Sequence, residues 1–188
     1  MTFVDKSLVI LDPRELRARL MGASDADTLA LARDCEKDVR AAAECFYTFA
    51  ETAVAVNGSE TELDFGKVQS SSLAKNLADC NRAFVVAVSI GHGVDRLIRR
   101  TSVLSASRHF VTDAVASAFI EALCDHVQGL LPQKTKVRFS PGYGDVPLEI
   151  QRPLLKYLGR TGITLTESCL LIPSKSVTFI AGVKNETD

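Results

Sequence analysis

An almost uninterrupted apolar run occupies residues 83–90, with the sequence Ala-Phe-Val-Val-Ala-Val-Ser-Ile. Such a run, rich in β-branched residues, predicts a β-strand that is covered on both faces. A strand of this kind needs a layer of structure on each side, which restricts the fold to a layered domain. The run is far too short to span a bilayer, so no membrane-spanning segment is expected.

Helices are predicted from capping residues and periodic apolar positions. Asp12-Pro13 predicts a helix that ends near Gly22, and Ser24 is predicted to cap a longer helix. The longest pattern covers residues 105–130 and places a broad apolar face on one side. The three serines at 70–72 suit either a flexible loop or the start of a helix that ends near residue 80. A further helix, broken near Pro153, is expected over residues 147–158.

Strands are expected both early and late in the chain. Aromatic and β-branched residues favour a strand over residues 46–56, although the preceding helix could continue through part of this segment. Residues 165–172 and 176–183, joined by Pro173-Ser174-Lys175, are predicted to pair as a β-hairpin. Weaker strand predictions cover residues 8–11, 62–65 and 134–138. Because strands and helices do not alternate regularly, we expect an α+β fold with a mainly antiparallel sheet and helices packed around it.

Length and composition limit the classes of protein to consider. With 188 residues, 46% of them hydrophobic, we expect a single domain over 1–188, with a helical and strand part at 1–80 and a second part at 81–183. The net charge of −1 gives no electrostatic basis for binding nucleic acid or an anionic membrane. The N-terminus lacks a basic region before a long apolar stretch, so no secretion signal is expected. Five cysteines without a Cys-x-x-Cys pair indicate buried, reduced thiols and a cytoplasmic protein.

The segment Arg138-Phe139-Ser140-Pro141-Gly142-Tyr143-Gly144-Asp145 is the best candidate for a ligand-binding loop. The Arg138 guanidinium suits a carboxylate or phosphate, because its N–H donors form a rigid fork. Gly142 allows close approach to the backbone, and Tyr143 offers a flat ring with a hydroxyl group. Such a loop can hold a small ligand with one anionic end and one flat part. The alternative is a surface turn with a solvated arginine.

Two other patterns could each indicate a binding site. Gly91-His92-Gly93 follows the buried strand, but Arg96 stands where the dinucleotide-binding motif needs a third glycine. His109, Asp113, Ser117, Glu121 and Asp125 recur at every fourth position of the longest predicted helix. This row either faces a cleft or metal, or forms a polar helix face. We favour the polar face and expect no metal site.

Four motifs, taken in order, resemble one protein family. They are Arg-x-x-Pro-Gly-Tyr at 138–143, Gln-x-Pro-Leu-Leu at 151–155, Ile-x-Leu-Thr-Glu-Ser at 163–168 and Pro-x-x-Ser-Val at 173–177. Their order and spacing resemble the reactivation (activation) domain of cobalamin-dependent methionine synthase, which binds S-adenosylmethionine. The resemblance covers residues 80–183 and is strongest over residues 138–177.

The resemblance implies a ligand-binding role for several residues and a catalytic role for none. Arg138 would bind the methionine carboxylate, the backbone near Ser140 and Gly142 would contact polar edges of the ligand, and Tyr143 would line the pocket. Glu167 would be a further acid of the pocket or would form hydrogen bonds within the sheet.

The resemblance also implies a role in methionine biosynthesis. Since the sequence has no Asp-x-His-x-x-Gly corrinoid-binding motif, we expect a stand-alone reactivation subunit, an accessory component rather than a complete enzyme. It would bind S-adenosylmethionine for reductive methylation of cob(II)alamin, the cobalamin (vitamin B12) being carried by a partner methionine synthase or other corrinoid methyltransferase. The alternatives are a non-catalytic binding or assembly protein of corrinoid metabolism that has lost S-adenosylmethionine binding, and an independent small-molecule enzyme that uses the Arg138 pocket.

Overall fold

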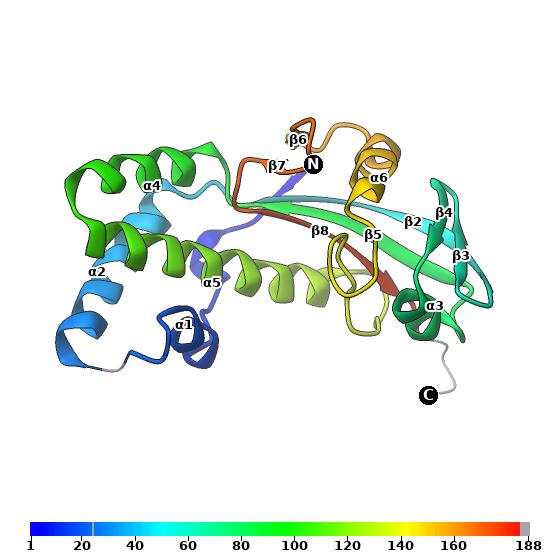
Figure 1. Cartoon of the computed structure of the whole chain (residues 1–188), viewed down its shortest axis with the longest axis horizontal. Coiled ribbons are helices and arrows are strands. Elements are labelled where there is room, and N and C mark those ends of the chain that lie inside the picture. The colour runs from blue at the N-terminus through cyan, green and yellow to red at the C-terminus, as the bar shows by residue number, and fades with distance from the viewer. Residues whose placement is uncertain (24, 185–188) are drawn as a thin grey trace.

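The computed structural model describes residues 1–23 and 25–184 and has a mixed α+β fold built on one antiparallel sheet (Figure 1). The strand order is β4-β3-β2-β5-β8, and β1 pairs with β2 beyond this path. The strands are β1 (Thr2–Phe3), β2 (Phe46–Asn57), β3 (Glu60–Leu63), β4 (Gly66–Gln69), β5 (Arg82–Ser89) and β8 (Ser176–Gly182). A separate pair joins β6 (Thr164–Leu165) to β7 (Leu171–Ile172).

Helices cover both faces of the sheet (Figure 1). One face packs against α2 (Ala26–Ala42), α4 (His92–Leu104) and α5 (Ala106–Leu130), while α1 (Pro13–Arg19) lies against α5. The other face packs against α3 (Ser71–Leu77) and α6 (Gln151–Leu158). The 3-10 turn η1 (Lys6–Leu8) comes after β1 in the chain, and η2 (Leu148–Ile150) comes directly before α6. The predicted α+β class with an antiparallel sheet is therefore confirmed.

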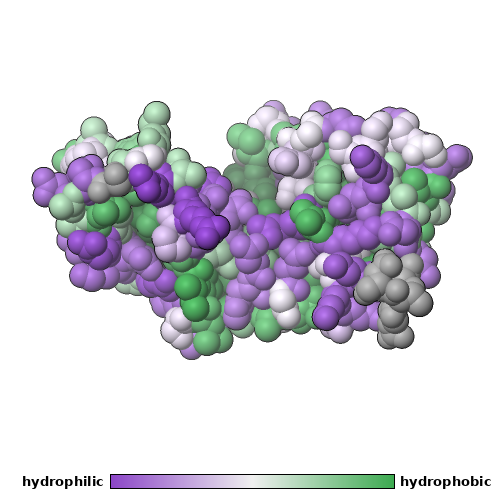
Figure 2. Space-filling model, turned by 90° about the horizontal axis from the view of Figure 1, so that it is seen from below, coloured by the Kyte–Doolittle hydropathy of each residue, from purple (hydrophilic) through white to green (hydrophobic). Residues whose placement is uncertain are grey.

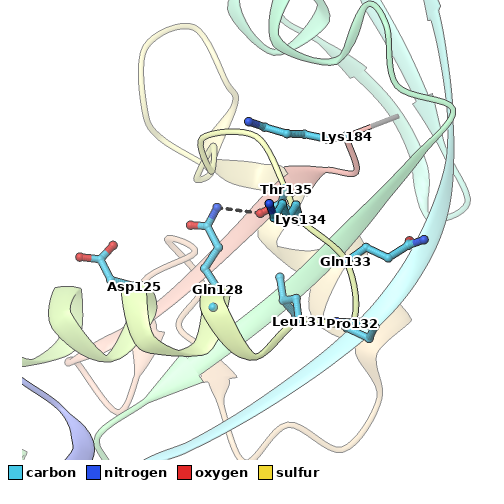
Figure 3. A pocket seen from close by; sticks show the side chains of 9 residues that line it. Asp125, Gln128, Leu131, Pro132, Gln133, Lys134, Thr135 and Lys184 are labelled. Atoms are coloured by element: carbon cyan, nitrogen blue, oxygen red, sulfur yellow. Dashed lines mark hydrogen bonds between the residues drawn. The ribbon is translucent and has the colours of Figure 1, made fainter. Parts of the chain in front are cut away.

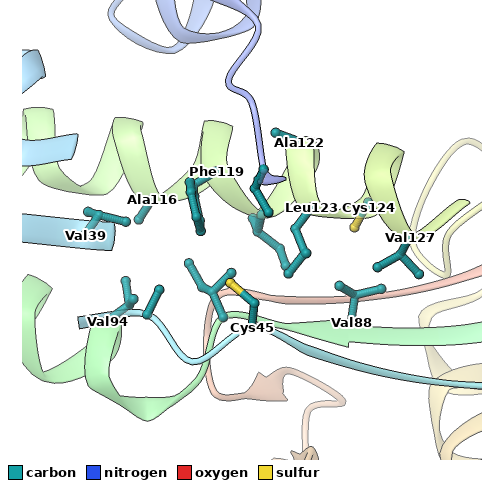
Figure 4. Packing of buried hydrophobic residues seen from close by; sticks show 14 of the residues in the cluster. Val39, Cys45, Val88, Val94, Ala116, Phe119, Ala122, Leu123, Cys124 and Val127 are labelled. Atoms are coloured by element: carbon teal, nitrogen blue, oxygen red, sulfur yellow. The ribbon is translucent and has the colours of Figure 1, made fainter. Parts of the chain in front are cut away.

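The central strand β5 contributes side chains to two separate cores. Phe84, Val86 and Val88 point toward α5 and its neighbours, whereas Ala83, Val85 and Ala87 point toward α3 and α6. This division follows from the two-residue repeat of a strand. Figure 4 shows the α5 side of this packing, where Val88 lies under the row of α5 side chains that includes Leu123 and Val127. The prediction of a strand buried on both faces is confirmed.

The longest helix begins where the sequence predicts. The Ser105 side chain accepts a hydrogen bond from the Arg108 amide and caps α5. Asp12 and Ser70 cap α1 and α3 in the same way, so the serines at 70–72 start a helix. At α2 the cap is Asp25, which accepts from the Thr28 amide. Ser24, the predicted cap, lies outside the described residues.

The glycines after β5 serve helix packing. Gly91 has a φ angle of 80° and forms the N-cap of α4. A Cβ atom added at Gly93 would lie 2.1 Å from the Ala42 carbonyl oxygen, so only glycine lets α4 approach the end of α2 this closely. This helix had not been predicted from the sequence.

Two strand predictions are wrong, because other groups take the backbone hydrogen bonds. Residues 8–11 are not a strand, since the carbonyls of Lys6 and Val9 accept from the Arg40 guanidinium. Residues 134–138 form no strand: Thr135 makes an isolated bridge to Val183, just after β8, and Phe139, next to Arg138, makes one to Ile180 of β8. The Gln128 side-chain amide donates to the Lys136 carbonyl, so this carbonyl is not available for strand pairing.

The predicted hairpin of 165–172 with 176–183 is also wrong. The first segment folds back on itself, because the Thr166 hydroxyl accepts from the Leu170 amide and Cys169 adopts a φ angle of 62°. The second segment, β8, pairs with β5 instead. The helix expected over residues 147–158 starts as the 3-10 turn η2 and becomes α-helical at Gln151. The change therefore comes before Pro153, which lies in the first turn of α6.

The surface seen from below in Figure 2 is mainly polar across its middle, with separate apolar patches. Within residues 1–23 and 25–184, no helix combines the length and apolar character needed to cross a bilayer. All five cysteines are free and buried, as predicted.

Candidate ligand-binding site

Arg138 lies between the edge of the sheet and the C-terminal half of α5. Its backbone runs alongside β8, and the neighbouring Phe139 amide donates to the Ile180 carbonyl at 2.9 Å. Its guanidinium carbon lies over the Phe179 ring, 5.8 Å from the centroid. This stacking and the flanking backbone hold the side chain against the sheet, with only 20% of it exposed.

The Arg138 guanidinium is bound by three acceptors from α5. Nη2 donates to Glu121 Oε2 at 3.0 Å, and Nη1 donates to Asp125 Oδ1 at 2.5 Å and to Gln128 Oε1 at 3.3 Å. Burial alone would lower the pKa of Arg138, but the hydrogen bond to Asp125 and other negative groups nearby, Glu121 among them, raise it above its ordinary value. The guanidinium therefore remains a fixed positive charge at every physiological pH.

A cavity of about 790 Å³ opens beside Arg138. Its size lies within the range typical of small-molecule sites. The lining combines two cations, a carboxylate, amide and hydroxyl groups, and apolar side chains: Glu121, Gln128, Thr135, Lys136, Val137, Arg138, Phe139, Ser140 and Tyr143.

Two smaller hollows adjoin this cavity through shared residues. One, of about 460 Å³, shares Gln128 and Thr135 with it and also includes Lys134 and Lys184. Figure 3 shows Asp125 and Gln128 projecting from α5 on one side of this hollow, and the bond from the Gln128 amide to Thr135. The other, of about 160 Å³, lies between α1 and α5 and shares Glu121 and Arg138 with the cavity.

The loop after Arg138 is held by hydrogen bonds within itself and to the start of α3. The Gly142 amide donates to the Val146 carbonyl at 2.9 Å, and Gly142 has a φ angle of 82°. Asp145 accepts from the Ser70 hydroxyl at 2.5 Å and from the Ser71 amide at 2.7 Å. These hydrogen bonds, with that of Ser70 first, hold the pKa of Asp145 below its ordinary value.

The aromatic part of the loop faces outward. Tyr143 is 67% exposed, and its ring meets the Phe139 ring edge-on with 5.8 Å between centroids. Val137 is also exposed, whereas Phe139 is half-buried against the core on the α3 and α6 side, and the three side chains form an apolar part of the cavity lining. An apolar surface of this kind can cover one face of a flat heterocycle.

The predicted site residues separate into two groups. Arg138, Ser140 and Tyr143 line the cavity together. Gly142 does not line it, and its amide is used within the loop. Glu167 also lies outside the lining, in the turn between β6 and β7, where its backbone carbonyl accepts from Arg152 at 2.5 Å.

Sequence reasoning missed the acidic side of the site. The row at every fourth position of α5 was taken as a polar face, yet Glu121 and Asp125 both bind Arg138. Further along the row, Asp113 binds Lys175 at 2.8 Å. The regular spacing was the available signal. Among the described residues, no group of three His, Cys, Asp or Glu side chains is placed to hold a metal ion.

Comparison with known proteins finds structural matches but no match by sequence. No family model matches the chain, and no curated protein matches it by sequence. A solved structure of the MetH reactivation domain bound to AdoHcy superimposes with a TM-score of 0.64 at 16% sequence identity. The superposition covers 97% of this chain and 72% of that chain. This chain thus has the fold of that reactivation domain.

Proposed function

We propose that this protein binds S-adenosylmethionine in the Arg138 cavity and presents it to a corrinoid-carrying partner as a reactivation module. The observation that carries the proposal is the Arg138–Glu121 pair on the wall of a ligand-sized cavity. It is supported by the fold, since the solved structure with this fold is bound to AdoHcy.

The Arg138–Glu121 pair suits the amino-acid end of such a ligand. That end carries a carboxylate and an ammonium group on the same carbon atom, and the pair presents the opposite charges 3.0 Å apart. Arg138 would bind the carboxylate, and Glu121 would bind the ammonium. Glu121 is assigned this role because it lines the large cavity, which Asp125 does not.

The remaining lining suits the rest of the ligand. Val137, Phe139 and Tyr143 offer an apolar and aromatic wall for the adenine ring. The backbone at Ser140 offers polar groups beside this wall. An aromatic face also attracts a sulfonium cation, as it does other cations. In this proposal the protein binds and orients the methyl donor.

In this proposal the partner supplies the methyl acceptor. A corrinoid held by a methionine synthase or another methyltransferase would provide the methyl-transfer chemistry, and the present chain would serve as an accessory component. We propose that residues 1–188 act as one unit in this role. Support comes from the sheet, where β2 from 1–80 pairs with β5 from 81–183. The stand-alone form and the cytoplasmic location stay predictions.

A binding or assembly protein that has lost the ligand is the second candidate. One observation favours it: both terminal nitrogens of Arg138 already donate to side chains of this chain. In that case the cavity would be closed to a carboxylate, and partner binding alone would remain.

Calorimetric titration with S-adenosylmethionine separates the two candidates. We expect binding to the wild-type protein and a loss of about 10- to 100-fold in Arg138→Ala, because charge-assisted hydrogen bonds contribute about 1.5–3 kcal/mol. Arg99→Ala, an exposed arginine on α4 outside the cavity, is the matched control and should leave affinity unchanged.

Two results of this titration would contradict the proposal. Unchanged affinity in Arg138→Ala would remove the site assignment. No binding by the wild type, with retained binding to a cobalamin-loaded methionine synthase, would favour the assembly protein.

A further inference from the structure

Asp125 occupies the position on Arg138 that a ligand carboxylate would need. Its Oδ1 lies 2.5 Å from Nη1, in the geometry of a carboxylate–guanidinium pair. Glu121 and Gln128 take further hydrogens of the same guanidinium. These bonds use three of the five N–H donors of the guanidinium, including both of those on Nη1, so a carboxylate that takes Nη1 has to replace one of its acceptors.

Asp125 is the acceptor that can leave most easily. Its side chain is 70% exposed, whereas that of Glu121 is 34% exposed. Glu121 is also held from the other side, because Arg19 Nη2 lies 3.6 Å from Glu121 Oε1. In the described part of the chain, the ion pair of Asp125 is with Arg138 alone. Because water reaches the Asp125 carboxylate, releasing it from Arg138 costs less than releasing the more buried Glu121 would.

The surroundings of Asp125 offer a place for the released carboxylate. Asp125 does not line the large cavity; it lines the two adjoining hollows. In the larger hollow, Lys134 and Lys184 supply positive charge opposite α5 (Figure 3). A rotation of the Asp125 side chain would therefore move its charge from Arg138 toward solvent and these lysines, and would leave Nη1 facing the ligand.

We propose that Asp125 is an internal substitute for the ligand carboxylate. It holds Arg138 in place while the cavity is empty and is displaced by a ligand with a free carboxylate. Asp125 thereby lowers the affinity for every such ligand and rejects ligands whose carboxylate cannot compete. This inference rests on the proposed function, and it reconciles that function with the occupied state of Arg138.

The test compares Asp125→Asn and Asp125→Ala with the wild type in calorimetric titrations. The probes are S-adenosylmethionine and 5′-methylthioadenosine, which lacks the amino-acid end. We expect both variants to bind S-adenosylmethionine about threefold to fivefold more tightly and to bind 5′-methylthioadenosine unchanged. Asp113→Asn, on the same helix row but paired with Lys175, should change neither affinity.

The expected increase in affinity is opposite in direction to what general electrostatics predicts. S-adenosylmethionine carries a net positive charge, so loss of a nearby carboxylate would weaken its binding if only general electrostatics acted. Weaker or unchanged binding in the Asp125 variants would overturn the inference while wild-type binding upheld the proposed function. Equal tightening for both probes would also overturn it.

Two further outcomes complete the test. Binding by Asp125→Ala where the wild type shows none would support the inference in its strongest form. No binding by any form would overturn the proposed function, and the inference would fall with it.

Discussion

Arg138 is the residue around which the candidate site is assembled. Its stacking on Phe179 and its bonds to α5 fix the guanidinium before any ligand arrives. Such preorganisation reduces the entropy that binding would otherwise cost. The motif around Arg138 was recognisable from the sequence, because a loop of arginine, glycines and tyrosine is a local pattern.

The partners of Arg138 were not predictable in the same way. Glu121 and Asp125 lie 17 and 13 positions before it, on a different element. Only the packing of α5 against β8 brings these carboxylates to the guanidinium. A periodic row of polar residues cannot show by itself which of its members will face solvent.

Glu121→Gln tests the other half of the proposed recognition. The amide would keep the shape of the side chain but lose the charge that binds the ligand ammonium. We expect S-adenosylmethionine and AdoHcy to bind about 10-fold more weakly, which corresponds to one charged hydrogen bond. Binding of 5′-methylthioadenosine should not change, and a parallel loss for that probe would contradict the assigned role.

At the scale of elements, the candidate loop is held by the start of α3. Asp145 accepts hydrogen bonds from Ser70 and Ser71, more than 70 positions earlier in the chain. The loop is thus fixed at Arg138 on one side and at α3 on the other. Its shape therefore depends on a carboxylate that does not touch the cavity.

The anchoring by Asp145 predicts a pH dependence. Because the folded protein lowers the pKa of Asp145 below the ordinary 3.8, its stabilising contribution is present above about pH 3.8 and is lost as pH falls through the lower folded value. In Asp145→Asn we expect a lower Tm at pH 7, and the difference from wild type should shrink below pH 3.8. A constant difference from pH 7 to pH 3 would contradict this mechanism.

The contact between α2 and α4 makes a second prediction. In Gly93→Ala the new methyl group would meet the Ala42 carbonyl, which belongs to backbone and cannot move cheaply. We expect a destabilisation of about 2–3 kcal/mol, or a Tm lower by about 4–12 °C. Gly129→Ala is the control, because nothing lies within 4 Å of its added Cβ atom, and it should raise the Tm slightly. Equal Tm values for Gly93→Ala and wild type would show that the helices separate easily.

Elements with a strong internal pattern were the ones that could be predicted. The apolar run of β5 and the capped, periodic α5 were both correct. The segments 8–11, 134–138 and 165–172 were not, because side chains of Arg40, Gln128 and Thr166 take backbone hydrogen bonds that strands would need. Short β4 was missed, since four residues carry too little periodicity.

At the scale of the whole molecule, the antiparallel sheet separates two cores and carries the site at one edge. The α5 side of the sheet supplies the acidic groups, and the chain beside β8 supplies Arg138. The long helix and the sheet edge thus form a rigid cleft, with the loop of Ser140 and Tyr143 at its margin. Rigid elements of this kind can hold a ligand in a fixed orientation toward a partner.

A crystal structure of the protein grown with AdoHcy tests the central claim most directly. We predict the ligand in the Arg138 cavity, with its carboxylate on Arg138, its ammonium on Glu121, its adenine against Tyr143, and Asp125 turned away from Arg138. Ligand density in another place, or an Arg138 still paired with Asp125 beside a bound ligand, would contradict it.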